Sequence, residues 1–220
     1  MITVISIENV SKIYKTKFNE VKALDDITLK VDDGEFVVVR GSSGCGKTTL
    51  LLTIGGMLRP TNGKVVISDN DIYAMSIKKR AIFRAKNIGF AFQMFHLVPY
   101  LSLIENVLLP VKVGIAQAGK GDGMELVKRL HLLGREHHKP SELSAGEKQR
   151  TAIARALLNH PKIILADEPT GNLDPDNAGE VIDYLSEFHH NGGTVIVVTH
   201  GTVADQYANR IIHLKEGRVS

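Results

Sequence analysis

The chain has 220 residues, a length typical of one large domain or two small ones. Of these residues 43% are hydrophobic, which is ample for a core. Its formal net charge is +3 and its basic residues are scattered, which gives weak support for contact with an acidic membrane surface and little for nucleic acid binding. No apolar run approaches the ~20 residues of a membrane span, and the first residues lack a secretory signal pattern. We therefore expect a soluble, cytoplasm-facing protein. The single cysteine forms no internal disulfide, which suits a reducing compartment.

The first part of the chain is expected to consist mainly of strands. Alternating apolar and polar residues predict antiparallel strands over Ile2–Ile7 and Val21–Val31. Further patterns predict a buried strand at Phe36–Val39, a helix from Thr49, and strands at Lys64–Ser68 and Ile88–Phe92.

A phosphate-binding loop lies between the strand at Phe36–Val39 and the helix from Thr49. The residues from Gly41 to Thr48 fit the pattern G-x-x-x-x-G-K-[ST] in full. Glycines let successive backbone N–H groups point inward, Lys47 reaches the terminal phosphates, and the Thr48 hydroxyl is placed to bind Mg²⁺. The predicted nucleotide-binding residues are Gly41, Ser42, Ser43, Gly44, Cys45, Gly46, Lys47, Thr48 and Thr49.

The pattern from Met94 to His160 is helical with polar connections, and strands return at Lys162–Ala166 and Thr194–Thr199 with a helix near Ala178–His189. We therefore expect one α/β domain over residues 1–220. Its core, with an antiparallel β subdomain, would be formed by about residues 1–93 and 160–220, and a helical subdomain by about residues 94–159.

Two carboxylates follow the strand at Lys162–Ala166. A phosphate loop alone is compatible with GTPases, kinases, helicases and transporters, so these residues matter for the choice. Asp167 is placed to hold Mg²⁺ through its water shell, and Glu168 to face the γ-phosphate and to orient or deprotonate the attacking water.

The segment Leu143-Ser144-Ala145-Gly146-Glu147 precedes an amphipathic helix. Ser144 and Glu147 form a capping-box pattern, and the helix start is also a potential anion site. Here the chain resembles the ATP-binding cassette (ABC) ATPases, whose signature reads Leu-Ser-Gly-Gly-Gln. Two positions depart from it: Ala145 replaces the first glycine, leaving Gly146 free to adopt a positive φ, and Glu147 replaces the glutamine and is expected to point away from phosphate.

The resemblance, which covers Ile7 to Val219, implies roles for further residues. Glu168 is implied as the catalytic base, with Lys47, Gln93 and His200 at the γ-phosphate and Gln93 also sensing Mg²⁺. Tyr14 matches the aromatic residue on which adenine stacks, and Asp174 matches the acidic member of the loop that crosses to a second subunit. Ser144 and Gly146 are implied to meet the ATP bound by that subunit.

The resemblance also implies partners. A single set of motifs implies a head-to-tail dimer that encloses two ATP molecules. The stretches around Gln93 and Asp167 resemble the branch that serves lipoprotein release, macrolide export and cell division, in which the ATPase lies at the cytoplasmic face of the membrane on a separate membrane permease. The alternative is a soluble cassette ATPase of DNA repair or of ribosomes. The short stretch between Lys47 and Ser144 argues against a repair protein, and the single cassette argues against a ribosomal one.

Three further features lead to expectations of their own. The apolar segment Met94–Val107 is expected to form, in part, an exposed patch that receives a short helix of the membrane subunit, with Tyr100 among its exposed members. Cys45 precedes a helix N-terminus, which favours a reactive thiolate. The pairs His137-His138 and His189-His190 lack matched acidic or thiol partners, which argues against a metal site.

Overall fold

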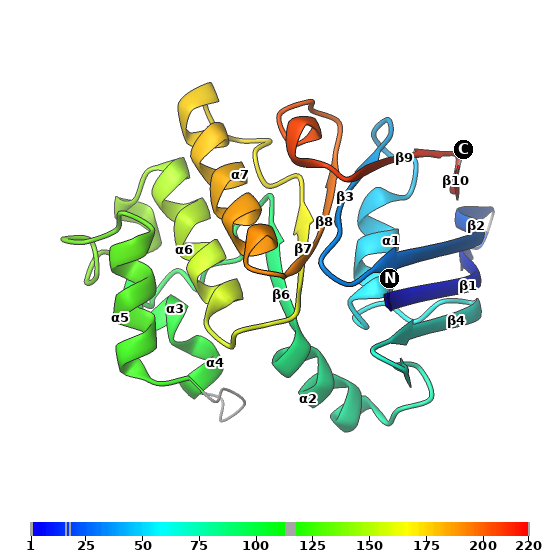
Figure 1. Cartoon of the computed structure of the whole chain (residues 1–220), viewed down its shortest axis with the longest axis horizontal. Coiled ribbons are helices and arrows are strands. Elements are labelled where there is room, and N and C mark those ends of the chain that lie inside the picture. The colour runs from blue at the N-terminus through cyan, green and yellow to red at the C-terminus, as the bar shows by residue number, and fades with distance from the viewer. Residues whose placement is uncertain (1, 16, 18, 113–117, 220) are drawn as a thin grey trace.

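Two β-sheets and the helices between and beside them form the chain, here a computed structural model that describes residues 2–15, 17, 19–112 and 118–219 (Figure 1). A four-stranded sheet has the order β2-β1-β4-β5, and a six-stranded sheet has the order β10-β9-β3-β8-β7-β6. The strands are β1 Thr3–Lys15, β2 Glu20–Asp32, β3 Phe36–Arg40, β4 Asn62–Ile67, β5 Asn70–Asp71, β6 Ile88–Phe92, β7 Ile163–Asp167, β8 Thr194–Thr199, β9 Arg210–Lys215 and β10 Arg218–Val219.

Helices cover both faces of the six-stranded sheet. α1 lies between the two sheets, and α6 and α7 lie on the opposite face of the larger one (Figure 1). The helices are α1 Lys47–Ile54, α2 Ile77–Asn87, α3 Leu103–Val107, α4 Leu109–Lys112, α5 Lys120–Arg129, α6 Ala145–Leu157 and α7 Pro175–His190, with 3-10 turns η1 Pro140–Glu142 and η2 Asp205–Tyr207. None of these helices is long and apolar enough to cross a membrane.

The central strands are buried on both faces, which explains their continuous apolar sequences. Every residue of β7 and of β8 is buried. Along β3 the side chains alternate: Val37 and Val39 join the core shared with α1, and Phe36 and Val38 join the core shared with α6 and α7.

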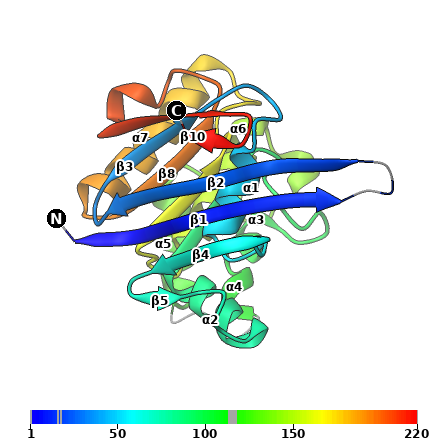
Figure 2. The same ribbon diagram turned by 90° about the vertical axis from the view of Figure 1, so that its right-hand side faces the viewer.

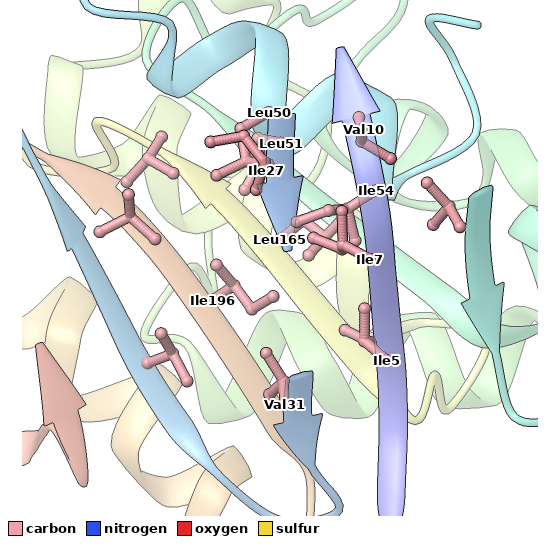
Figure 3. Close-up of a cluster of buried hydrophobic side chains, with 14 of the residues drawn as sticks. Ile5, Ile7, Val10, Ile27, Val31, Leu50, Leu51, Ile54, Leu165 and Ile196 are labelled. Atoms are coloured by element: carbon pink, nitrogen blue, oxygen red, sulfur yellow. The ribbon is translucent and has the colours of Figure 1, made fainter. Parts of the chain in front are cut away.

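The core between the sheets is formed by branched aliphatic side chains (Figure 3). Ile5 and Ile7 of β1 and Ile54 of α1 are at most 1% exposed, and they meet Leu165 of β7 in the same cluster. This core attaches the antiparallel sheet and α1 to the central strands, so the helix that follows the phosphate loop is fixed against the sheet.

The register of the parallel strands aligns their carboxyl ends. Arg40 at the end of β3 lies opposite Thr199 of β8, Asp167 at the end of β7 lies opposite Val198 of β8, and Phe92 of β6 lies opposite Asp167. The loops that follow β3, β6, β7 and β8 therefore all leave the sheet at the carboxyl ends of its strands, where open α/β sheets bind their ligands.

Strands β6 and β8 have the predicted bounds, and β7 and α7 were predicted within a few residues. β1 and β2 extend further than expected, whereas α2, β9 and β10 were not predicted. The predicted helical stretch contains α3 to α6, and its residues 113–117 lie outside the described residues. α6 also packs against β6, so it belongs as much to the core as to the helical stretch.

Leu165→Ala should lower the free energy of unfolding by about 2–5 kcal/mol, because it leaves a cavity between α1 and the sheet at a fully buried position. Urea unfolding measures the change. Leu133→Ala is the control, because the Leu133 side chain is 57% exposed and its loss should cost less than about 0.5 kcal/mol. Equal losses in the two variants would contradict this description of the core.

Candidate nucleotide-binding and catalytic site

The phosphate loop is a tight backbone turn between β3 and α1. Gly46 has φ 110° and caps α1, and a Cβ atom there would lie 2.2 Å from the Ala23 carbonyl oxygen. Only glycine fits this position, because both the backbone conformation and the space exclude a side chain. The loop borders a cavity of about 260 Å³ that is also lined by Thr48, Thr49, Gln93 and Glu168.

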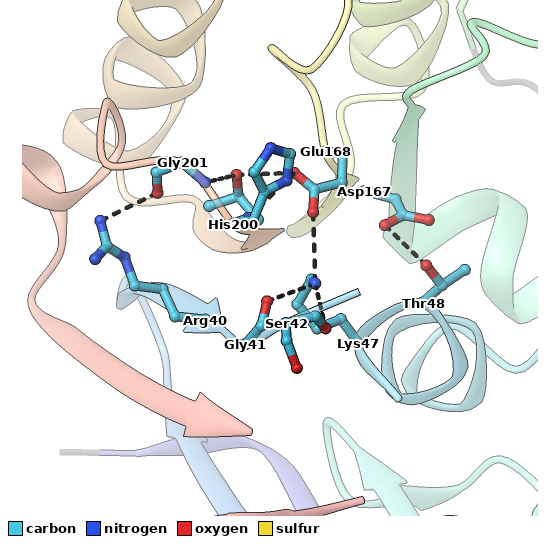
Figure 4. Close-up of polar contacts among 10 residues, drawn as sticks. Arg40, Gly41, Ser42, Lys47, Thr48, Asp167, Glu168, His200 and Gly201 are labelled. Carbon is cyan, nitrogen blue, oxygen red and sulfur yellow. Dashed lines mark hydrogen bonds and ion pairs between the residues drawn. The ribbon is translucent and has the colours of Figure 1, made fainter. Parts of the chain in front are cut away.

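Lys47 is buried and points back over the loop. Its Nζ atom donates to the carbonyl oxygens of Gly41, at 2.8 Å, and of Ser42, at 3.2 Å, and lies 3.6 Å from Oε1 of Glu168 (Figure 4). The Lys47 ammonium group lies at the N-terminus of α1, where unpaired backbone N–H groups also attract negative charge. An anion that enters the loop would therefore meet both the ammonium group and these N–H groups.

Thr48 and Asp167 form an oxygen pair beside the loop. The Thr48 hydroxyl donates to Oδ1 of Asp167 at 3.1 Å (Figure 4). Such oxygens suit Mg²⁺, which binds proteins through one or two carboxylates and completes its coordination with phosphate oxygens and water. The described residues contain no cluster of three or more His, Cys, Asp and Glu side chains that could hold a metal ion.

Glu168 is held on several sides. Its backbone has φ 44°, a conformation that is uncommon for a residue with a side chain. Oε2 accepts hydrogen bonds from the Thr199 hydroxyl at 2.9 Å and from the His200 backbone N–H at 3.2 Å, and lies 3.0 Å from Nδ1 of His200 (Figure 4). The Thr199 hydroxyl itself accepts from the Gly201 N–H at 3.0 Å, which directs its proton toward Glu168.

The pKa values of the two neighbouring carboxyl groups, Asp167 and Glu168, shift in opposite directions. Burial raises the pKa of Asp167, and the hydrogen bond from Thr48 offsets this only in part. Burial acts on Glu168 in the same direction, but hydrogen bonds from His200 and Thr199 outweigh it and hold the pKa of Glu168 below its usual value. Glu168 is therefore ionised at neutral pH, as a general base must be.

Gln93 follows β6 and lies against the loop that follows β7. A Cβ atom on Gly171 would lie 2.8 Å from Nε2 of Gln93, and the Asn172 side-chain amide donates to the Gln93 carbonyl oxygen at 3.1 Å. The structure thus brings Gln93, which lines the cavity, against Gly171 and Asn172, although the two segments are far apart in sequence.

Two residues that the sequence analysis missed hold the segment after Gln93. Arg155 of α6 donates to the carbonyl oxygens of Phe95, at 2.8 Å, and His96, at 2.7 Å, both of which have positive φ. Asn106, fully buried, bonds the backbone of Val98 through both its amide nitrogen and its amide oxygen. Neither contact follows a local pattern, so no sequence signal identified them.

Ser144 and Asp174 both cap helices. Ser144 and Glu147 form the predicted capping box of α6, and the Glu147 carboxylate also pairs with Arg135 at 2.9 Å, so it is engaged away from the phosphate loop. Asp174 caps α7 and accepts from the backbone and the side chain of Asn177.

The structure explains the glycine at position 146 differently from the sequence analysis. It is helical and has no positive φ. A Cβ atom there would lie 2.0 Å from Oδ1 of Asn177, so glycine is needed for the close approach of α6 and α7.

Tyr14 and Cys45 are among the predicted residues that do not line the cavity. Tyr14 of β1 is outside the lining of the cavity, and the Lys12 ammonium lies 5.3 Å from its ring centroid. The Cys45 side chain is only 6% exposed and lies among the core residues beneath the loop. This burial argues against the reactive thiol that the helix N-terminus suggested, because a buried thiol is poorly accessible.

Residues 24–171 match the family model described as ABC transporter. The chain belongs to this family. It is 40% identical to the lipoprotein-releasing system ATP-binding protein LolD of Pseudoalteromonas translucida, over 99% of this chain and 95% of LolD. It is 42% identical to the macrolide export ATP-binding/permease protein MacB of Chlorobaculum tepidum, over 98% of this chain but only 33% of MacB.

Solved structures agree with the fold. A dimeric ATP-binding cassette in a post-hydrolysis state, bound to ADP and Pi, superposes with a TM-score of 0.92 at 38% identity, over 98% of this chain and 96% of that one. The protein is an ABC-type ATPase subunit homologous to LolD and MacB. The predicted class of fold, a phosphate-loop α/β core of ABC type, is confirmed.

Thr199→Val should raise the pKa of Glu168, because valine keeps the shape of threonine but donates no hydrogen bond to the carboxylate. A carbon-13 NMR titration of the Glu168 carboxyl group measures it. The lowered pKa stabilises the fold above the unfolded-state pKa of glutamate, and this contribution is lost as pH falls through the folded-state pKa. The acid side of the stability curve should therefore move to higher pH in the variant. Thr199→Ser should titrate like the wild type, and an unchanged pKa in Thr199→Val would show that the hydroxyl does not act on Glu168.

Proposed function

We propose that this ABC ATPase hydrolyses Mg²⁺-bound ATP as a head-to-tail dimer at the cytoplasmic face of the membrane. There it drives a separate membrane permease of the lipoprotein-release or macrolide-export kind. The observation that carries the proposal is Glu168: an ionised carboxylate, oriented by Thr199 and His200 and facing the ammonium group of Lys47 at the edge of the phosphate loop.

The roles of the residues follow from their positions. Lys47 exchanges the Gly41 and Ser42 carbonyl oxygens for the β- and γ-phosphates, since phosphates bind the ammonium more strongly than neutral carbonyls do. Glu168 accepts the proton of the attacking water, and His200 orients Glu168 and faces the γ-phosphate. Bound Mg²⁺ would supply charge neutralisation for the phosphate oxygens, held by Thr48 and Asp167 with Gln93 nearby. Tyr14 stacks on the adenine.

The dimer is needed because the signature residues lie away from the phosphate loop of their own chain. Ser144 and Gly146 begin α6, whereas none of the residues that line the 260 Å³ cavity belongs to α6. A second chain, turned head to tail, would bring its Ser144, Gly146 and Asp174 over this cavity. Two solved cassettes that resemble the chain, each 38% identical to it, are described as dimeric.

A groove suits the membrane permease. It has a volume of about 480 Å³, and its walls come from α2, β6, the segment after Gln93, α4 and α6. Phe90, Phe92 and Leu109 give it an apolar lining that fits a short amphipathic helix. Because His96 of the Gln93 segment also lines it, the groove can transmit changes at the nucleotide. The match to LolD, named as the ATP-binding protein of a lipoprotein-releasing system, supports a partner in transport.

The expected patch over Met94–Val107 is only partly exposed. Leu103 and Val107 belong to the core, whereas the side chains of Met94 and Tyr100 are 70% and 75% exposed.

The alternative function is that of a soluble cassette ATPase of DNA repair or of ribosomes. The exposed side chains, and the groove that is lined by His96 of the same segment, favour a membrane partner, because the rival class has no membrane subunit to bind.

Glu168→Gln should bind Mg²⁺-ATP and dimerise but hydrolyse ATP more slowly by on the order of 10²–10⁴, because the amide keeps the shape and lacks the base. Phosphate release measures turnover, and size-exclusion chromatography with Mg²⁺-ATP measures the dimer. Glu125→Gln, at an exposed position on α5, is the control and should behave like the wild type. A Glu168→Gln protein that stays monomeric or hydrolyses ATP normally contradicts the assignment.

Tyr100→Glu should abolish co-purification with the membrane permease while the isolated chain keeps its ATPase activity, because a charge is placed on an exposed apolar contact. Leu133→Glu, at another exposed position, is the matched control and should co-purify normally. Thermal unfolding of both variants shows whether the fold is intact. Normal co-purification of Tyr100→Glu would mean that the permease docks elsewhere.

A further inference from the structure

Helix α2 concentrates positive charge that the fold does not neutralise. It carries the cations Lys78, Lys79, Arg80, Arg84 and Lys86 within Ile77–Asn87, and the sequence has no acidic residue between Asp71 and Glu105. Across the whole described part of the chain, none of these five cations forms an ion pair with a carboxylate, although most other surface arginines do.

The five cations divide between two faces of the helix. Arg80 and Arg84 face inward: the Arg80 guanidinium lies 5.1 Å from the Tyr73 ring centroid, and Arg84 donates to the Gly56 carbonyl oxygen at 3.2 Å. Burial lowers the pKa of Arg84, and the nearby Arg80 lowers it further. The inner face of α2 is thus already crowded with positive charge and has a structural use.

The outer face has no such use. Lys78, Ile82 and Lys86 follow one another at intervals of four residues, and Lys79 lies three residues before Ile82, so all four lie on one side of the helix. All four are exposed. Three lysines therefore surround Ile82 on this face, and the helix has a second exposed isoleucine, Ile77, at its first residue. No residue of α2 is buried.

The place of this face in the molecule suggests what it meets. α2 projects at the lower edge of the molecule in Figure 1 and in Figure 2. Arg84 and Ala85 of α2 form one wall of the groove proposed for the permease helix, so the outer face is the rim of that groove. A protein docked there on a membrane subunit carries α2 toward the membrane.

We propose that the outer face of α2, formed by Lys78, Lys79, Ile82 and Lys86, binds the anionic headgroups of the cytoplasmic membrane surface. Lysines are flexible point charges that attract a diffuse anionic surface, in contrast to arginines, which recognise carboxylates and phosphates bidentately. The long lysine stems lie along the interface while Ile82 inserts at the boundary of headgroups and acyl chains. The membrane-facing position of α2 rests on the proposed function, but lipid binding by the isolated chain does not.

The test is co-sedimentation of the full chain with vesicles of phosphatidylcholine, with and without phosphatidylglycerol. The wild type should bind only the vesicles that contain phosphatidylglycerol, and binding should weaken as salt is added. The triple variant Lys78→Ala, Lys79→Ala, Lys86→Ala should bind these vesicles at least about tenfold more weakly than the wild type, because each lysine near an anionic surface adds to the attraction. Alanine keeps the helix, because it has the highest helix propensity.

The control removes the same charge elsewhere. Lys30→Ala, Lys128→Ala, Lys215→Ala changes three exposed lysines on β2, α5 and β9 and should leave vesicle binding unchanged. ATP hydrolysis in the same preparations separates failure of this proposal from failure of the proposed function. Equal loss in the two triple variants, or wild-type binding that ignores phosphatidylglycerol, overturns the proposal. If the α2 variant instead loses only its association with the permease, the face binds an acidic protein segment and the lipid assignment is wrong.

Discussion

The parallel register of β6, β7, β8 and β3 is the constraint on which the site depends. Arg40 lies opposite Thr199, Val198 opposite Asp167, and Asp167 opposite Phe92, so the four strands end at one level. The next residues along the four strands are Gly41, His200, Glu168 and Gln93. A shift of one residue in any strand would turn its last side chain to the opposite face of the sheet. The buried, branched residues of these strands therefore also fix the chemistry, because they fix the register.

Within that frame, charge keeps the site ready for an anion. The Lys47 ammonium is satisfied by two carbonyl oxygens and approached by Glu168, and Glu168 is held by Thr199 and His200. Lys47 and Glu168 are 3.6 Å apart, longer than a charge-assisted hydrogen bond, so a phosphate can replace this contact. A γ-phosphate would take over Lys47, and a water molecule would then find Glu168 ionised and oriented. Positioning and electrostatics, which supply most of phosphoryl-transfer catalysis, are built in before the nucleotide arrives.

Local patterns in the sequence predicted the fold well where one signal dominates. The phosphate loop, the buried strands β6 and β8, and the capping box of α6 depend on neighbouring residues, and all three were found. α2 was missed because its inner face is made of Arg80, Arg84 and Phe83 rather than of an apolar stripe, and its burial depends on Tyr73 and Gly56, which precede it. Thr199 and Arg155 were missed for the same reason: each acts through partners that only the tertiary fold brings near. Asn106 was missed because it bonds the irregular segment that begins at Val98, which has no repeating pattern. Gly146 was found, but its reason, contact with Asn177, could not be read from one segment.

The contact between α6 and α7 joins motifs that the sequence keeps apart. Asn177 donates to the Asp174 carboxylate, accepts from Arg150 at 2.9 Å, and lies against Gly146, so it links the start of α6 to the 171–174 loop as one packed unit. Gln93 touches Gly171 in that same loop. In the proposed dimer, the Ser144 end of this unit faces the ATP of the partner subunit, whereas Gln93 lies beside the chain's own phosphate loop. A change at one nucleotide thus has a packed route to the surface that meets the other, along which Asp174 and Ser144 each cap the helix that they begin.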